Sequence, residues 1–344
     1  MARRLPAEWE PQGAVLLTWP HPASDWAPIL DRVEPVYDTL VKAVAAREPA
    51  VVVCADPTHA AHVRTRLERC GADLARVTLP TVPTNDTWVR DYGPITVLED
   101  GRPLLLDFGF DGWGGKFEAR LDDAVPQRLH AGRALGTTPL ATVAWVLEGG
   151  SIESDGAGTI LTTRQCLMAR AGPGASVADV AASLAHHLGA ARVLWLAHGE
   201  LEGDDTDGHV DTLARFCDRS TIAYVRCDDP SDSHHPGLAA MEAELLALRT
   251  AEGAPYRLVP LPWPGARYGL AGERLPLTYA NFLVVNRAVL VPTYDDPADA
   301  RALAVIGAAF PGREAVPVPS LPLVLQHGSL HCATMQIPRE VFEP

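Results

Sequence analysis

The sequence lacks any apolar run long enough to cross a membrane, and its cysteines show no pairing pattern. No segment reaches the roughly 18 consecutive apolar residues of a spanning helix, and the opening MARRLPAEWEPQ has no apolar core of a signal peptide. The six cysteines include no CxxC pair, which makes disulfides and structural zinc poor explanations for them. We therefore expect a cytoplasmic protein with reduced thiols.

Positive charge is also scarce in this chain. Lysine and arginine total 29 against 43 acidic residues, giving a formal net charge of −14. Such a surface repels nucleic acids and anionic membranes, and it can favour a cationic ligand. We expect no nucleic-acid partner and no membrane partner.

Short apolar runs alternate with helical patterns along the chain. Of its 344 residues, 47% are hydrophobic, which is enough for a sizeable core. The runs typical of buried strands are 14–19, 50–55, 103–108, 159–163, 193–197, 281–285 and 288–294, and the helical patterns are 25–47, 56–71, 176–191, 237–253 and 296–310. This alternation predicts an α/β fold.

Nothing in the sequence separates two halves. The 30 prolines are spread through loops, and no Ser/Gly/Pro-rich linker interrupts the pattern. The strand and helix units recur at about fifty to seventy residues, which fits a pseudo-repeated architecture although no sequence self-similarity proves one. We predict a single domain over residues 1–344.

Four segments concentrate polar, aromatic and glycine residues where strands should end. They are NDTWVRDYGP (85–94), WVLEGGSIESDG (145–156), DDTDGHVDTLARF (204–216) and HGSLHCATMQIP (327–338). Each taken alone has an ordinary structural explanation, because caps, ion pairs and buried thiols outnumber active-site groups. Glu148, between WVL and GG, is expected to be half-buried and therefore to need a partner.

His209 and Asp211 lie two residues apart, and therefore on one face of an extended segment. This spacing occurs in metal sites, but no second histidine-rich segment accompanies it, and a site needs three or four converging ligands. We therefore expect no metal and no cofactor.

The combination of Cys332, His209 and separate carboxylates has a coherent use on a guanidinium group. A guanidinium is planar and cationic, and carboxylates such as Asp91 and Asp211 match its N–H donors. Holding it in place would make attack by the Cys332 thiolate effectively intramolecular. His209 could protonate the departing nitrogen and later deprotonate water, with Glu148 holding its tautomer.

Two details of the cysteine segment follow from the same chemistry. Surrounding carboxylates should raise the pKa of Cys332, so we expect a mostly protonated thiol that ionises more easily once a cationic substrate binds. His331 should point away from Cys332 if the segment is extended, and we do not assign it as the base.

The chain resembles the agmatine deiminase family, a branch of the guanidine-modifying superfamily that includes bacterial peptidyl-arginine deiminases. The resemblance runs nearly end to end, through PAEWEPQGAVLLTWP, NDTWVRDYGP, DFGFDGWGGKF, LEGGSIESDGAGTILTTRQCL, DDTDGHVDTLARF, LTYANFLVVN, VLVPTYDD and HCATMQIP. It implies a five-fold pseudo-symmetric α/β propeller (pentein fold). It also implies cofactor-free hydrolysis of agmatine to N-carbamoylputrescine and ammonia, in polyamine (putrescine) biosynthesis.

Roles transfer to this chain by matching motif. The resemblance implies that Cys332 is the nucleophile, His209 the general acid/base and Glu148 its support. It further implies that Asp91 and Asp211 hold the guanidinium nitrogens and that Trp88 lines the substrate channel. Trp113, Asp86 and Asp207 are further candidate substrate contacts, and the acid for the distal amine is open among Asp86, Asp205 and Asp207. Relatives often associate, so a homodimer is expected by analogy.

The sequence departs from the family pattern in three places. MARAGPGAS follows TTRQCL in place of an Asn/Pro/Arg-rich run, and His327 replaces a glycine-rich lead into the cysteine segment. After the strand ending in DF, the peptidyl-arginine branch carries arginines that grip a C-terminal carboxylate. This chain has GFDGWGGK there, and Gly112 and Gly114 favour a small amine-bearing substrate.

Other readings remain open. A relative acting on peptidyl-arginine or free arginine is the nearest alternative. A metal-dependent ureohydrolase would release urea and need ligands that the sequence does not supply. A non-catalytic propeller scaffold is disfavoured because all five catalytic residue types are present.

Overall fold

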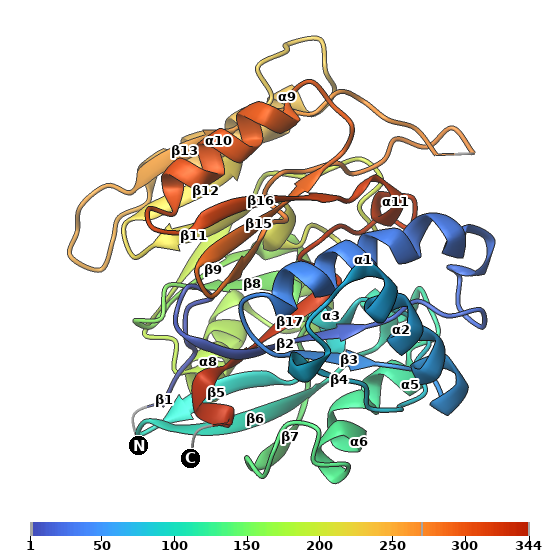
Figure 1. Ribbon diagram of the computed structural model, residues 1–344. Coiled ribbons are helices and arrows are strands. Elements are labelled where there is room, and N and C mark those ends of the chain that lie inside the picture. The colour runs from blue at the N-terminus through green and yellow to red at the C-terminus, as the bar shows by residue number, and fades with distance from the viewer. Residues whose placement is uncertain (1–2, 270, 343–344) are drawn as a thin grey trace.

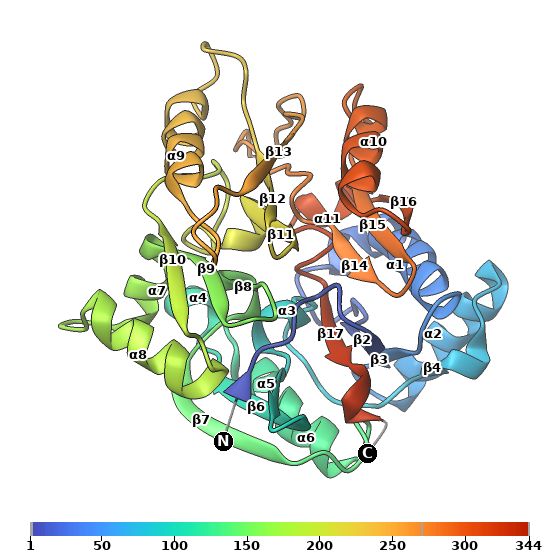
Figure 2. The ribbon, with the colours of Figure 1, turned by 90° about the vertical axis from the view of Figure 1, so that its left-hand side faces the viewer.

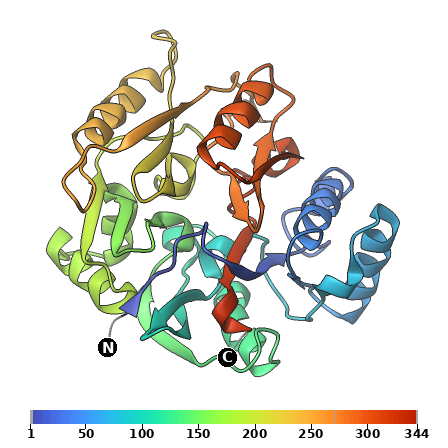
Figure 3. The same ribbon diagram turned by 60° about the vertical axis from the view of Figure 1, so that its left-hand side comes forward.

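The computed structural model describes residues 3–269 and 271–342 and shows an α/β protein with five small sheets (Figure 1). Figure 3 shows the sheets arranged around a common centre, with the longer helices on the outside. In the part of the chain described, no helix is both long and apolar enough to span a bilayer.

One sheet joins the two ends of the chain. Its order is β17 (Thr334–Pro338), β2 (Gln12–Thr18), β3 (Ala50–Val53) and β4 (Val77–Thr78). β17 runs antiparallel to β2, whereas β2, β3 and β4 are parallel and are connected through α1 (Leu30–Ala45) and α2 (Pro57–Cys70). Because β17 pairs with β2, the cysteine segment that precedes β17 lies at the centre of the molecule (Figure 2).

The other four sheets share one construction. Each contains an antiparallel hairpin and a third strand that pairs in parallel with the hairpin's second strand. These hairpins and third strands are β5 (Ile95–Glu99), β6 (Arg102–Gly109) and β7 (Leu140–Val146); β8 (Ile152–Ser154), β9 (Thr159–Thr163) and β10 (Arg192–Leu196); β11 (Ala214–Asp218), β12 (Thr221–Val225) and β13 (Arg257–Leu261); β14 (Leu283–Val285), β15 (Ala288–Thr293) and β16 (Glu314–Pro319). β1 (Arg3–Arg4) adds an antiparallel edge to β5.

Helices fill the connections between these strands. The α-helices are α3 (Val89–Tyr92), α4 (Gly112–Gly115), α5 (Arg120–Asp123), α6 (Val125–Ala131), α7 (Arg164–Ala171), α8 (Val177–Leu188), α9 (His235–Ala247), α10 (Asp299–Ala309) and α11 (Leu321–Val324). The 3-10 turns are η1 (Ala27–Ile29), η2 (Leu74–Arg76), η3 (Gly149–Ser151), η4 (Val210–Thr212) and η5 (Arg339–Val341).

The predicted α/β class is confirmed, and local sequence signals explain where several elements begin and end. Asp56 caps α2 by accepting from the His59 backbone N–H, and Gly71 ends it with φ +74°, a conformation that suits glycine. Ser176 and Asp179 form a reciprocal capping box at the start of α8. All seven predicted strand runs overlap observed strands, and 159–163 coincides with β9.

Candidate active site

The four polar segments meet at the centre of the molecule, each delivered by a different connection. Asp91 lies on α3, Glu148 directly precedes η3, and Asp211 lies on η4. Cys332 occupies the turn immediately before β17. Asp91 and Cys332, which are 241 positions apart in the sequence, therefore line the same cavity.

Cys332 is 5% exposed and lines the main cavity. Its Sγ lies 3.8 Å from Asp211 Oδ2, and Asn281 Nδ2 donates to it at 3.3 Å. Asn281 also accepts the backbone N–H groups of His331 and Cys332 through Oδ1, so it fixes the turn that presents the thiol. Burial, followed by the charges of Asp211 and Asp91, raises the pKa of Cys332 well above its usual value.

His209 is fully buried between two carboxylates. Its Nε2 lies 2.8 Å from Glu148 Oε2, and its Nδ1 lies 3.6 Å from Asp91 Oδ1. Burial alone would lower the pKa of His209, but Asp91, Cys166 and the hydrogen bond to Glu148 together raise it well above its usual value. The imidazole is therefore a proton donor in the free protein, with Nδ1 turned toward the predicted guanidinium site.

Glu148 is anchored from the side opposite His209. Arg170 Nε donates to Glu148 Oε1 at 2.6 Å, while Arg170 Nη1 donates to Asp207 Oδ2 at 2.7 Å. Burial alone would raise the pKa of Glu148, but the contacts with His209 and Arg170 lower it. The atypical segment after TTRQCL therefore has a local function, because its helix α7 carries the arginine that keeps Glu148 ionised.

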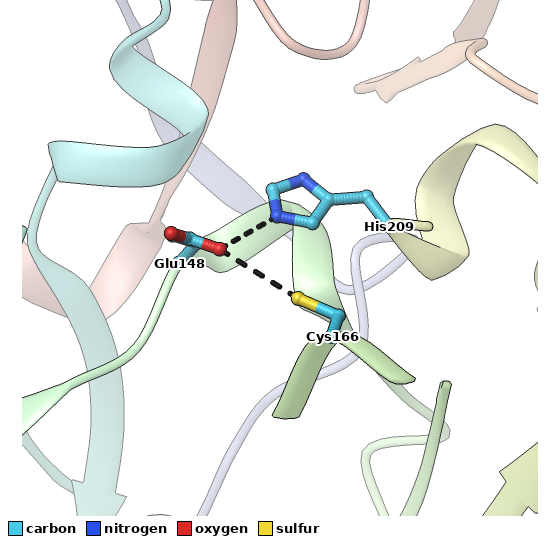
Figure 4. Close-up of side chains that lie close together, drawn as sticks. All are labelled: Glu148, Cys166 and His209. Carbon is cyan, nitrogen blue, oxygen red and sulfur yellow. Dashed lines mark hydrogen bonds and ion pairs between the residues drawn. The ribbon is translucent and has the colours of Figure 1, made fainter. Parts of the chain in front are cut away.

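Figure 4 shows Glu148, Cys166 and His209 pointing toward one another, a group that could in principle hold a metal ion. Both Glu148 oxygens, however, already accept hydrogen bonds from cationic side chains, and the Arg170 guanidinium would repel a divalent cation. Burial also raises the pKa of Cys166, which disfavours the thiolate that a metal requires. The donor set therefore suits a hydrogen-bond network better than a metal.

Asp91 is held in place by two donors. The Gly150 backbone N–H donates to Oδ1 and Trp113 Nε1 donates to Oδ2, both at 3.0 Å. Burial raises the pKa of Asp91 to about 6. The positive charge of His209 acts against this rise, and the negative charges of Glu148 and Asp211 add to it. Trp113 thus acts on the site through Asp91, besides lining the cavity.

Two buried atoms of the site have no hydrogen-bond partner among the described residues, namely His209 Nδ1 and Asp211 Oδ1. Asp211 is fully buried, and its other oxygen accepts from His331 Nδ1 at 2.7 Å. Leaving buried polar atoms unpaired costs about 1–3 kcal/mol each, which a suitable ligand would recover. The two atoms therefore indicate a ligand that donates to a carboxylate and interacts with an imidazolium N–H.

The cavity above these residues has a volume of about 460 Å³. Five aspartates line it, and among the described lining residues there is no lysine or arginine. These acids are Asp25, Asp86, Asp91, Asp204 and Asp205, accompanied chiefly by Trp88, Trp113, Phe117, His327 and Gly328. Such a lining favours a cation, and His209, Asp211 and Glu148 lie behind it rather than on its wall.

Three of the residues predicted at the cavity have distinct positions. Trp88 lines the wall with its ring against Gly328, where a Cβ would come within 2.5 Å of the indole. Asp86 lines the cavity while accepting from Trp26 Nε1 at 2.8 Å, and burial raises its pKa to about 6. Asp207 is not among the lining residues, because its oxygens are bound by Arg170 and Lys116. The geometry gives no support to its predicted contact with substrate.

A substitution at Gly150 tests the packing around His209 and Asp91. A Cβ at this position would lie 2.5 Å from His209 Nδ1 and 2.9 Å from Asp91 Oδ1. We expect Gly150→Ala to displace both groups and to lower kcat/KM by about 100-fold or more for the deimination that the family resemblance implies, measured by ammonia release. Gly237→Ala is the matched control, because a Cβ there meets nothing within 4 Å. Equal activity of the two variants would contradict this packing.

The chain is similar to agmatine deiminases and to arginine or peptidyl-arginine deiminases. Curated agmatine deiminases of Pseudomonas putida and Pseudomonas aeruginosa are 34% and 33% identical, covering 98% and 97% of this chain and 96% and 95% of those proteins. A structure from C. jejuni, an agmatine deiminase variant with serine in place of a cysteine and with substrate bound, matches with a TM-score of 0.89 and 34% identity over 97% of this chain and 96% of that chain.

A structure described as a candidate arginine deiminase of Porphyromonas gingivalis is 50% identical, with a TM-score of 0.91 over 98% of this chain and 99% of that one. The model of the Porphyromonas-type peptidyl-arginine deiminase family matches residues 4–338. With a match over almost its whole length, the chain belongs to the Porphyromonas-type peptidyl-arginine deiminase family.

Proposed function

We propose that the protein is an agmatine deiminase that hydrolyses agmatine to N-carbamoylputrescine and ammonia through a covalent intermediate on Cys332. The observation that carries this proposal is the pair of unpartnered atoms, His209 Nδ1 and Asp211 Oδ1, beside the Cys332 thiol beneath an acidic cavity. The names of the similar curated proteins and of the C. jejuni structure support the same activity.

Asp91 and Asp211 recognise the guanidinium group in this proposal. Asp211 Oδ1 is free to accept an N–H, and Asp91 is fixed by Gly150 and Trp113 near His209. The planar cation donates to both carboxylates, which orients its central carbon toward Cys332 Sγ. A bound cation also lowers the free energy of the thiolate, so substrate binding favours ionisation of the thiol.

The first covalent step forms a bond between Cys332 Sγ and the amidino carbon. The electron pair of the breaking C–N bond goes to the departing nitrogen, which takes a proton from His209 Nδ1 and leaves as ammonia. The remaining carbon is bound to sulfur as a planar thiouronium group. Glu148, held ionised by Arg170, stabilises the imidazolium before transfer and orients the ring.

The second step returns the enzyme to its starting state. Neutral His209 takes a proton from water, and the hydroxide adds to the thiouronium carbon. The C–S bond then breaks with its electron pair on sulfur, the hydroxyl proton passes to that sulfur, and the thiol and the carbamoylated amine are restored and released. The sum is agmatine plus water giving N-carbamoylputrescine plus ammonia. The proton that the Cys332 thiol gives up to solvent on substrate binding is taken up by the departing ammonia, which ends as ammonium, so the proposed reaction balances without a cofactor.

The cavity lining supports a substrate tail that carries an amine. Asp86 and Asp205 line the cavity above the reaction centre, whereas Asp207 is engaged with Arg170 and Lys116. Carboxylates attract an ammonium group and repel the carboxylate of free arginine or of a C-terminal arginine. Agmatine, which has an amine and no carboxylate, fits this lining best.

The fold and the setting of the reaction are part of the proposal. Five sheets of related construction around a common centre support a five-fold pseudo-symmetric propeller that forms a single catalytic domain (Figure 3). The reaction would supply a carbamoylated diamine for putrescine biosynthesis.

A product analysis on three substrates tests the activity. Purified protein is incubated with agmatine, arginine and a C-terminal arginyl peptide, and products are identified by mass together with ammonia and urea. We expect agmatine to gain about one mass unit, the exchange of an imine for oxygen, with ammonia and no urea. Deimination confined to the peptide or to free arginine would contradict the substrate assignment, and urea would contradict the reaction.

The protonation state of Cys332 can be measured by alkylation. Burial and nearby carboxylates raise the pKa of this thiol, so its thiolate fraction should be small at neutral pH and grow with increasing pH. Because only the thiolate reacts with iodoacetamide, we expect the rate of Cys332 modification, followed by peptide mass mapping, to rise throughout the neutral and alkaline range. A rate that had already levelled off at about pH 6 would show an ionised thiol and contradict the expectation.

A further inference from the structure

His331 is held between two buried carboxyl groups on the side of the site away from the cavity. Its Nδ1 lies 2.7 Å from Asp211 Oδ2, and its Nε2 lies 2.7 Å from Glu8 Oε2. The histidine is 1% exposed, Asp211 is 0% exposed and Glu8 is 6% exposed, so water cannot take the place of any of these contacts. Cys332, the next residue, faces the cavity instead.

These two contacts restrict where protons can lie. An ionised carboxylate only accepts hydrogen bonds, and a neutral imidazole has one donor and one acceptor nitrogen. If His331 were neutral between two ionised carboxylates, one ring lone pair would face an oxygen at 2.7 Å in a buried setting. Two protons are therefore shared by the two contacts, and they lie either both on the histidine or partly on a carboxyl group.

The surroundings of Glu8 require this group to be ionised. Its Oε2 also accepts from Arg215 Nη2 at 2.7 Å, and its Oε1 accepts from the Val284 backbone N–H at 2.7 Å. Burial alone would raise the pKa of Glu8, but Arg215, His331 and Arg90 bring it far below its usual value. A proton on either oxygen of Glu8 would point at a donor.

Asp211 is the other group that could hold the second proton. Burial alone would raise its pKa, but the hydrogen bond and charge of His331, together with His209 and Arg215, lower it. The buried cluster also balances in charge when His331 is cationic. Its three acids are Asp211, Glu8 and Glu153, and its three cations are His331, Arg215 and Arg90.

We propose that His331 is a positioning residue that donates from both ring nitrogens, to Asp211 and to Glu8, and so holds Asp211 with Oδ1 directed to the guanidinium. The catalytic part of this inference rests on the proposed function, whereas the charge on His331 does not. His331 touches no substrate; it acts through Asp211. Glu8 accepts from His331 Nε2 and is itself held by Arg215. The N-terminal segment that contains Glu8 is therefore connected directly to the site.

The charge on His331 can be observed without any turnover. Side-chain ¹⁵N spectra are recorded on wild-type protein labelled with ¹⁵N-histidine, and the His331 signals are identified as those lost in His331→Asn. We expect both ring nitrogens to carry a proton at neutral pH, as donors to Asp211 and Glu8. A neutral tautomer under the same conditions would overturn the proposal whether or not the protein deiminates agmatine.

The role of His331 toward Asp211 requires kinetics. His331→Asn keeps a neutral donor near Asp211 but removes the charge, so Asp211 should become easier to protonate. We expect KM for agmatine to rise by at least about tenfold near pH 6.5, with a smaller change in kcat, and the defect to shrink as pH increases. A loss that was equal at every pH would indicate a merely structural role and overturn the assignment.

The matched control is His62→Asn, which removes another histidine–carboxylate pair, that of His62 Nε2 with Glu34 Oε1 at 2.6 Å near the surface. We expect this variant to keep the wild-type KM and pH profile. If His331→Asn fails to fold, Glu8→Gln retains an acceptor for the ring and should produce the same pH-dependent rise in KM. If wild-type protein turned over no guanidine, the proposed function would be contradicted. The ¹⁵N spectra would still show whether both ring nitrogens of His331 carry protons.

Discussion

Cys332→Ala should abolish turnover of agmatine, with kcat falling by at least about 10⁴-fold, because Cys332 is the only cysteine among the described residues that line the cavity. The side chain is small, and its backbone turn is fixed by Asn281 through the main chain, so the variant should fold normally. Substrate binding should persist, since the guanidinium contacts are assigned to Asp91 and Asp211. Ammonia release and calorimetric binding of agmatine measure the two effects separately.

Cys70→Ser is the matched control for this variant. Cys70 is only partly buried, and its thiol contacts the backbone carbonyls of Asp38 and Leu67, far from the cavity lining. It should retain nearly full activity. Retention of turnover by Cys332→Ala, or an equal loss in both variants, would contradict the assignment of Cys332 as nucleophile.

His209→Asn should lower kcat by about 10²–10⁴-fold with a smaller effect on KM. The asparagine cannot exchange a proton with the departing nitrogen or with water, whereas the two guanidinium-binding carboxylates remain. The acid limb of kcat/KM should persist and move to higher pH, because Asp91 must still ionise for binding and loses the His209 charge that lowers its pKa, which burial already raises to about 6. Steady-state kinetics across pH measure both quantities.

Glu148→Gln provides an internal comparison for the same prediction. It removes the charge that stabilises the His209 imidazolium while keeping a side chain of similar size beside Arg170. We expect a loss in kcat of the same kind, with His62→Asn as the unaffected histidine control. Unchanged kcat in His209→Asn would show that another group moves the protons.

Much of the fold could be predicted because many of its strands are short apolar runs, although this pattern misses the inner strands β5 and β12. The missed strands include β13 and β16, which lie at sheet edges and contain Pro260, Pro317 and Pro319. Proline is tolerated at an edge because the missing N–H leaves no internal bond unmade, yet it weakens a strand signal in the sequence. The helix predicted from residue 25 begins only at Leu30, because η1 with Pro28 occupies the first turn.

The residues proposed to react could be selected as candidates from the sequence, whereas the residues that hold them in place could not. Cys332, His209, Glu148, Asp91 and Asp211 lie in glycine-punctuated polar segments that converge. Asn281 belongs to a run predicted as an ordinary strand and Arg170 to a segment predicted as an atypical loop, and the importance of both arises only from tertiary contacts.

The position of Asp207 shows a limit of spacing arguments. It lies two residues from His209, as Asp211 does, but its φ of +66° and its pairing with Arg170 and Lys116 direct it away from the cavity. Arg170 could not be anticipated as its partner, because the segment containing it departs from the family pattern. The positive φ of Asp207 and its ion pairs with Arg170 and Lys116 thus determine how its side chain is oriented, and the motif alone reveals neither of them.

The central claim is that Cys332 carries the substrate during turnover. The most direct measurement is intact-protein mass spectrometry after acid quenching of the enzyme mixed with agmatine, followed by peptide mapping. The account predicts a transient adduct equal to agmatine less ammonia, located on the peptide containing Cys332 and lost as N-carbamoylputrescine accumulates. Product formation with no adduct at any quench time, or an adduct on a different cysteine, would contradict it.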